Sequence, residues 1–142
     1  MFLLSFLFAQ DSFAKDNEIR IGACIGLNDC TVGVQLEYGR PEFTVGLHSS
    51  LMFNGIFAHY NFMNTGEELI RPILGLRAQY DLDICLYGGC SEDIFLTPYL
   101  GGEVHSRYIT LRATVGPNFW ADGTLAYNAI GATAAILGNI AF

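Results

Sequence analysis

The stretch ELIRPILGLRAQYDLDIC, residues 68–85, decides the fold, because its residues alternate between two series. The apolar series is Ile70, Pro72, Leu74, Leu76, Ala78, Tyr80 and Leu82. The mainly polar series is Arg71, Ile73, Gly75, Arg77, Gln79, Asp81 and Asp83. A period of two residues is typical of a β-strand, whose successive side chains point to opposite faces. The stretch is therefore predicted to be a strand, and the next question is which of its faces points inward.

The same alternation recurs along the chain and predicts seven further strands. They are expected at 18–27, 31–39, 42–53, 56–63, 94–104, 107–116 and from about 126 to the end. Asn54-Gly55 is typical of a two-residue type I′ turn and is predicted to join the third and fourth strands. This turn would place Ser50 opposite His59. Pro98 lacks an N–H group, so a bulge or a projecting strand is expected there, and AYNAIGATAAILGNIAF (126–142) is also compatible with an apolar helix.

The composition indicates which face is which. Only 15% of residues are charged, Lys15 is the single lysine, and the net charge is -7, which argues against a nucleic-acid partner. A soluble sheet normally covers its wet face with charged side chains. The polar series here holds a few charges among glycines and threonines, which suits the crowded interior of an eight-stranded barrel. Because a sheet crosses lipid only as a closed barrel with its apolar side chains outward, we predict an all-β, closed, antiparallel, up-and-down transmembrane β-barrel of eight strands.

The first residues differ from the rest of the chain. An apolar run from Phe2 to Ala9 is followed by Ser12-Phe13-Ala14, a small-x-small pattern typical of signal peptidase sites. The run is shorter than the roughly 20 apolar residues that a membrane helix needs. Residues 1–14 are therefore predicted to be a signal peptide, and residues 15–142 a single barrel domain.

Four cysteines form two close pairs, Cys24 with Cys30 and Cys85 with Cys90. In an exported protein this arrangement favours disulfides, and pairing within each pair would clip the ends of one hairpin. Four buried thiols are the alternative. Zinc is not indicated, because neither pair has the two-residue spacing of zinc sites.

Aromatic residues are grouped toward the predicted strand ends, as in the interfacial girdles of membrane barrels. One group is Tyr38, Phe43, Phe62 and Phe142, and the other is Phe53, Tyr80, Tyr87 and Trp120. The chain ends at Phe142, with outward Ile140 and Ile136 before it. With this pattern the chain resembles the small eight-stranded bacterial outer-membrane barrels of the OmpA-transmembrane-domain and OmpX type over nearly all of residues 18–142.

The resemblance implies an integral protein of the bacterial outer membrane with both termini in the periplasm. Its surroundings would be outer-membrane lipid and lipopolysaccharide, and Phe142 would be the signal to the barrel assembly machinery. The outer turns would be 26–30, 54–55, 81–93 and 116–124, which places both cysteine pairs outside. These turns would form an acidic rim of Asp29, Asp81, Asp83, Glu92, Asp93 and Asp122. Asp81, Asp83, Glu92 and Asp93 are candidate Ca²⁺ ligands, and solvated acidic loops are the alternative.

Three functions are compatible with such a barrel. The favoured one is a structural or surface-interaction role with a plugged lumen, which would hold an ion-pair network of Arg20, Glu37, Arg77, Glu103 and Arg112. A narrow channel for ions or small solutes is one alternative. The other is a lipid A-modifying enzyme that uses Ser50 as nucleophile with His59 or His48 as base. These three side chains would point into the lumen, and no carboxylate is assignable as an orienting partner, so we expect no enzyme. No cofactor motif is present.

Overall fold

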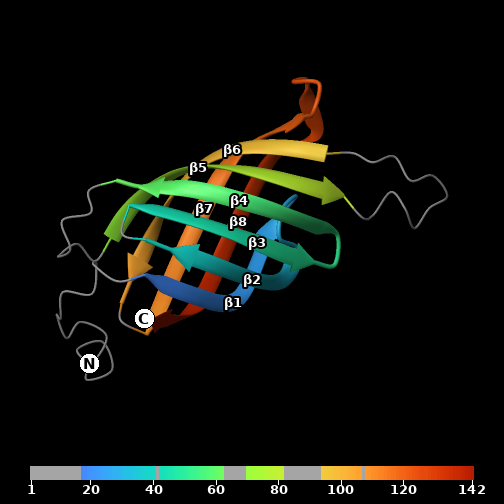
Figure 1. Cartoon of the computed structure of the whole chain (residues 1–142). Coiled ribbons are helices and arrows are strands. Elements are labelled where there is room, and N and C mark those ends of the chain that lie inside the picture. The colour runs from blue at the N-terminus through green and yellow to red at the C-terminus, as the bar shows by residue number, and fades with distance from the viewer. Residues whose placement is uncertain (1–16, 41, 63–69, 82–93, 107) are drawn as a thin grey trace, which may run out of the picture.

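The computed structural model describes residues 17–40, 42–62, 70–81, 94–106 and 108–142. Within these ranges every regular element is a strand. The strands are β1 (Glu18–Leu27), β2 (Val32–Gly39), β3 (Phe43–Ser50), β4 (Phe53–Asn61), β5 (Ile70–Asp81), β6 (Ile94–His105), β7 (Ile109–Trp120) and β8 (Leu125–Ala141). Each strand pairs antiparallel with its neighbours in sequence, and β8 pairs with β1 to close the barrel (Figure 1). The predicted all-β, closed, eight-stranded up-and-down barrel is confirmed.

The start of β1 and the end of β8 lie side by side, with Glu18 opposite Ala141. We call this the termini end of the barrel and the other the opposite end. The helix considered for residues 126–142 is wrong, since residues 125–141 form β8. The predicted signal peptide, residues 1–14, lies outside the described residues. In the described ranges no helix is long and apolar enough to cross a membrane.

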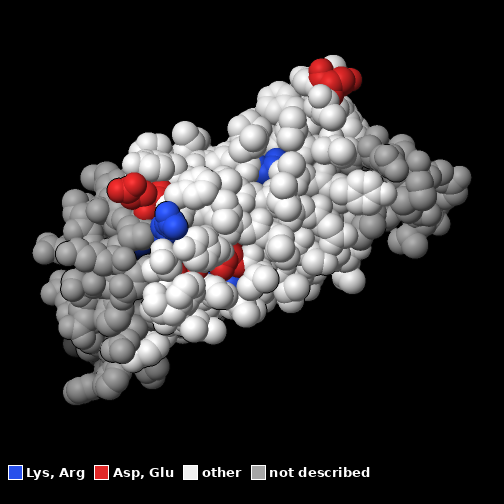
Figure 2. Space-filling view, in the orientation of Figure 1, with Lys and Arg blue, Asp and Glu red and all other residues white. Residues whose placement is uncertain are grey.

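Side chains alternate between a polar interior and an apolar exterior. In β7, for example, Thr110 and Arg112 are buried, whereas Leu111 and Val115 are 48% and 45% exposed. Large apolar side chains are exposed on all eight strands. The wall that faces the viewer in Figure 2, built of β1 to β5, is mostly uncoloured, with only small red and blue patches between its two ends. The polar series of the sequence therefore faces inward.

The turn between β3 and β4 does not lie at Asn54-Gly55. β3 ends at Ser50 and β4 begins at Phe53, so residues 51–52 form the connection. The Ser50 hydroxyl accepts a hydrogen bond from the Phe53 N–H (3.0 Å) and donates one to the Phe53 carbonyl (2.8 Å). A Cβ atom on Gly55 would lie 2.8 Å from Cε1 of His48. The glycine thus makes room for an inward ring instead of supplying positive φ for a turn.

The irregularity expected at Pro98 occurs in the ladder between β6 and β7. Pairing stops at Leu96 with Phe119 and resumes at Leu100 with Val115. Pro98 still lies opposite Leu76 of β5. The bulge itself falls one strand further, where the register of β7 against β8 shifts between Pro117 and Phe119. Both prolines lack an N–H donor, which explains why the ladders weaken at this height of the barrel.

Candidate functional site

The filled lumen is the candidate functional site, because it holds the buried charges of the described residues. Near the termini end lies a group that we call the charge cluster: Glu18, Arg20, Glu37, Arg71, Glu103, His105 and Arg112. They come from β1, β2, β5, β6 and β7. Each is brought inward by the period of two along its own strand. The cluster therefore needs only strand residues to form.

Arg112 is the centre of the charge cluster. Its Nη1 lies 2.5 Å from Oε1 of Glu37, and its Nη2 lies 2.9 Å from Oε2 of Glu103. Arg20 approaches the same two carboxylates from β1, with Nη1 at 3.7 Å from Glu37 and 3.5 Å from Glu103. Two guanidinium groups thus share two carboxylates. This arrangement satisfies charges that would be very costly if left unpaired in the interior.

The rest of the cluster extends from this core toward the termini. Arg20 Nε lies 3.0 Å from Oε2 of Glu18, and His105 Nε2 lies 3.3 Å from its Oε1. Arg71 Nη1 lies 3.9 Å from Oε1 of Glu103. Three arginines thereby face three glutamates, so the charges of these six side chains balance within the cluster.

Aromatic side chains separate the charge cluster from the opposite end. The rings of Phe57 and His59 stack at 6.1 Å, and Nδ1 of His59 lies 3.1 Å from the Tyr99 hydroxyl. Arg77 lies over the Tyr99 ring at 4.8 Å. Gly75, with Tyr99 Oη 2.6 Å from where its Cβ would be, leaves room for that ring. The middle of the lumen is therefore filled by packed side chains.

The connection between β1 and β2, residues 28–31, folds into the lumen, and we call it the inward turn. Its Asn28 has a φ of 54°, a left-handed conformation that asparagine tolerates. The Asn28 carbonyl accepts hydrogen bonds from Gln79 Nε2 (3.1 Å) and Asn118 Nδ2 (3.2 Å). Asp29 is 1% exposed and accepts hydrogen bonds from Arg77 and Thr133. The turn thereby contacts β5, β7 and β8.

A disulfide holds the inward turn in place. Cys24 and Cys30 are bonded, with their Cα atoms 5.9 Å apart, as the sequence predicted. Both cysteines are buried and pack on Ala135 and Leu137 of β8. The other predicted pair, Cys85 and Cys90, lies outside the described residues. Among the described residues this disulfide therefore clips the inward turn from within the barrel.

Two predicted placements of charged residues are wrong because of the inward turn. Asp29 was expected in an acidic outer rim, but its side chain is buried in the lumen. Arg77 was expected to pair with Glu37 and Glu103, but its partner is Asp29. Arg20, Glu37, Glu103 and Arg112 do meet, as predicted. A turn has no period, so its direction could not be read from the pattern.

Aromatic residues differ between the two ends. At the termini end Phe43, Phe62 and Phe142 are 45%, 41% and 66% exposed, as an outward girdle requires. At the opposite end Phe53 is only 4% exposed and meets Phe95 edge to face, at 6.4 Å. Trp120 stacks on Phe95 at 4.4 Å. The second girdle is thus wrong for Phe53, which caps the lumen instead, and Tyr87 lies outside the described residues.

The residues proposed for lipid A hydrolysis do not meet. His59 lies opposite Thr44, and Ser50 is engaged in the β3–β4 turn. His48, opposite Gly55, has its Nε2 3.9 Å from Oδ1 of Asp29. A nucleophile and its base must lie within hydrogen-bond reach, so the pairing of Ser50 with His59 was wrong.

The candidate Ca²⁺ ligands are largely absent from the described part of the chain. Asp83, Glu92 and Asp93 and the side chain of Asp81 lie outside the described residues. Elsewhere, over the described ranges, no three His, Cys, Asp or Glu side chains are grouped as a metal ion would need.

No protein-family model matches the chain, and comparisons with curated proteins and with solved structures give no match. The resemblance to the OmpA and OmpX barrels therefore stays a prediction. Phe142, its suggested assembly signal, is exposed, and its N–H donates to the Asn17 carbonyl at 3.1 Å.

Proposed function

We propose that the protein is an integral outer-membrane β-barrel with a filled polar lumen and a structural or surface-interaction role. The carrying observation is the inverted distribution of polarity. Arg20, Glu37 and Glu103 are 1–2% exposed, whereas outward residues such as Leu100 and Ile21 are 62% and 54% exposed. In water this arrangement would bury charged groups and expose apolar side chains, and both are unfavourable. In lipid it is the arrangement of a membrane barrel.

A filled lumen is supported by three successive layers along the barrel. These are the charge cluster, the inward turn and the packed rings of Phe53, Phe95 and Trp120. Eight strands enclose a space that side chains alone suffice to fill. Arg112 and Arg20 together balance the charges of Glu37 and Glu103, so this core of the cluster has no uncompensated charge to draw ions through. We therefore expect the protein not to conduct.

Among the described turns of the opposite end, few could recognise a partner. The β3–β4 connection has two residues, and Asp29 and Cys30 of the inward turn are buried. The β7–β8 turn, residues 121–124, is exposed and carries Asp122. Surface recognition at this end would therefore use the β7–β8 turn among these segments.

The first experiment separates the membrane barrel from a water-soluble one. A closed membrane barrel resists SDS until it is heated, so the unboiled protein should migrate differently from the boiled protein, and it should fractionate with outer membranes. Identical mobility together with recovery in the soluble fraction would contradict the proposal. Ion flux across vesicles that contain the folded protein should stay at the level of empty vesicles.

A matched pair of leucines sharpens the test. Leu100 lies in the middle of β6, and Leu51 lies in the β3–β4 turn, where it is 77% exposed. Leu100→Arg should lower the free energy of unfolding in bilayers by about 2–4 kcal/mol, because arginine is unfavourable at mid-membrane depth. Leu51→Arg should change it by less than about 1 kcal/mol. Equal tolerance of both substitutions would indicate that the wall faces water.

A further inference from the structure

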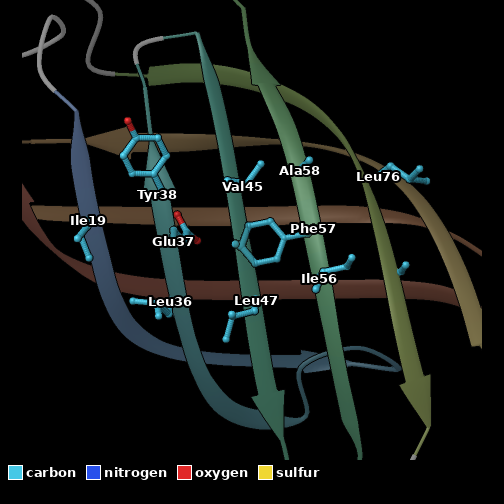
Figure 3. A pocket seen from close by; sticks show the side chains of 12 residues that line it. Ile19, Leu36, Glu37, Tyr38, Val45, Leu47, Ile56, Phe57, Ala58 and Leu76 are labelled. Carbon is cyan, nitrogen blue, oxygen red and sulfur yellow. The ribbon is translucent and has the colours of Figure 1, made fainter.

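The outward wall of β1 to β5 contains an apolar hollow of about 680 Å³ (Figure 3). This volume lies within the usual range for sites that bind small molecules. Its outward lining includes Tyr38, Val45, Leu47, Ile56, Ala58 and Leu76. The inward residues Glu37, Gly46 and Phe57 also line it. The six outward residues lie on the apolar series of their strands, so the hollow can be entered from the outer face of the wall.

The hollow exists because two small side chains lie side by side. Val45 of β3 is opposite Ala58 of β4, and Ala58 is opposite Leu76 of β5. Tyr38 lies on the other side of Val45. The larger side chains around Val45 and Ala58 therefore form a rim, which consists of Leu36, Tyr38, Leu47, Ile56 and Leu76. Figure 3 shows this rim, with Tyr38 at the end nearest the β2–β3 turn.

Charged groups stand at that same end. Arg40 donates a hydrogen bond from Nε to the Tyr38 hydroxyl at 3.4 Å, and its guanidinium lies 5.9 Å from the centre of the Tyr38 ring. Among the described residues Arg40 is the one exposed cationic side chain, since the other four arginines are buried. Glu42, also exposed, lies two residues along the same turn. The turn thus presents one positive and one negative group beside an apolar hollow.

We infer that this hollow binds one zwitterionic phospholipid of the phosphatidylethanolamine class. An acyl chain lies over Val45 and Ala58, the phosphate meets Arg40 and the ammonium group meets Glu42. Arginine suits a phosphate because its planar fork donates several hydrogen bonds at once. The inference rests on the proposed function, which puts this wall in lipid and the β2–β3 turn at the level of the headgroups.

A second copy of the chain fits the hollow less well than a lipid does. If two copies met through the same wall, two concave surfaces would face each other and enclose an unfilled volume, whose lining would lose van der Waals contacts. An acyl chain is flexible and fills a concave surface of this kind. The pair of opposite charges at one end also matches a phosphoethanolamine headgroup.

Native mass spectrometry of the full-length barrel in neutral detergent tests the inference. The probes are phosphatidylethanolamine, phosphatidylglycerol and diacylglycerol with the same acyl chains. We expect the protein to retain one phosphatidylethanolamine in preference to either of the other probes. Ala58→Phe, which fills the hollow, should lower this retention by at least about tenfold, and Arg40→Gln should abolish the preference over diacylglycerol. Ala134→Phe, an outward exposed alanine of β8, is the matched control and should bind as the unaltered protein does.

Retention that is unchanged by Ala58→Phe would overturn the inference. Equal binding of diacylglycerol or phosphatidylglycerol by the unaltered protein would overturn the headgroup assignment, and lipid-free particles with two protein copies would assign the hollow to self-association. Heat-dependent mobility in SDS is measured on the same samples. A sample that shifts on heating but retains no lipid contradicts the lipid site alone, whereas a sample that does not shift contradicts the membrane barrel itself.

Discussion

The two ends of the lumen are filled by different means. The charge cluster at the termini end is made only of strand side chains, and each points inward through the geometry of its own strand. Toward the opposite end the inward turn fills the lumen with Asn28 and Asp29, which contact Gln79 and Arg77 of the wall. A barrel can therefore close its lumen from the walls or with a folded connection, and this protein does both.

The two fillings also differ in how completely their polar atoms are satisfied. In the charge cluster, the carboxylates of Glu37 and Glu103 lie within ion-pair distance of two arginines each or more. Near the inward turn more buried atoms lack a hydrogen-bond partner: Asp29 Oδ1, Gln35 Oε1, His48 Nδ1 and Nε2, Arg77 Nε and Gln79 Oε1. In the charge cluster Arg20 Nη1 and Glu103 Oε1 also lack one, but both lie within ion-pair distance of an opposite charge. Such groups cost stability unless water reaches them. The charge cluster should therefore be the more sensitive of the two to substitution.

Arg112→Leu should have the largest effect, a loss of about 3–5 kcal/mol of folding free energy, because it leaves two buried carboxylates without their main partner. The measurement is the urea midpoint of folding into lipid vesicles, followed by mobility in SDS. Asp122→Asn, at an exposed turn carboxylate outside the proposed lipid site, is the control and should leave the midpoint nearly unchanged. Equal losses for the two variants would mean that the cluster contributes little to folding.

The disulfide comes next. Cys24→Ala with Cys30→Ala should lower stability by about 2 kcal/mol, since the bond closes a short loop and constrains the unfolded chain only modestly. Reductant should lower the stability of the unaltered protein by at least as much. It should lower the stability of the double variant less, because only Cys85 and Cys90 remain to be reduced there. If the double variant were as stable as the oxidised protein, the inward turn would not depend on its clip.

Asp29→Asn should cost less, about 1.5 kcal/mol, the low end for a hydrogen bond to a charged group. The amide keeps the shape of the side chain and can still accept from Thr133, but it no longer neutralises Arg77. Comparison with Glu103→Gln in the charge cluster gives the sharpest contrast between the two ends. The Glu103→Gln variant should lose more stability than Asp29→Asn. The reverse order would show that the inward turn is the stronger filling.

The sequence pattern predicted the charge cluster better than the inward turn, for a physical reason. The alternation of a strand sets the direction of side chains such as Arg20 and Glu103. Asp29 lies in a turn, where no alternation sets the direction of its side chain. The β3–β4 turn failed differently. His59 was assigned to Ser50 and in fact faces Thr44, six residues away. Because six is even, both registers put the same side chains inward, so the alternation could not reveal the error.

Gly55 shows why the turn signal was misleading. Asn-Gly is favoured in tight turns because both residues tolerate positive φ, but among the described residues only Asn28 and Gly123 have positive φ. In a narrow barrel glycine has a second use, which is to admit a large neighbour such as His48. A composition rich in inward glycines therefore weakens turn prediction in this class of fold.

The smallest effect concerns Asp122, a turn aspartate that faces water where Asp29 faces the lumen. The Thr124 N–H and hydroxyl donate hydrogen bonds to Asp122 Oδ1 at 2.8 and 2.7 Å, and they lower the pKa of Asp122 below its ordinary value of 3.8. The charged carboxylate therefore stabilises the β7–β8 turn above that value, and this contribution is lost as the pH falls through the lowered pKa. Thr124→Val removes the hydroxyl and keeps the N–H, so the pKa of Asp122 should rise only part of the way. Carboxyl NMR titration in micelles measures the shift, and overall stability at neutral pH should not change detectably. A large loss of stability in Thr124→Val would mean that this exposed turn is held as tightly as the inward turn, and the contrast between the two aspartates would not hold.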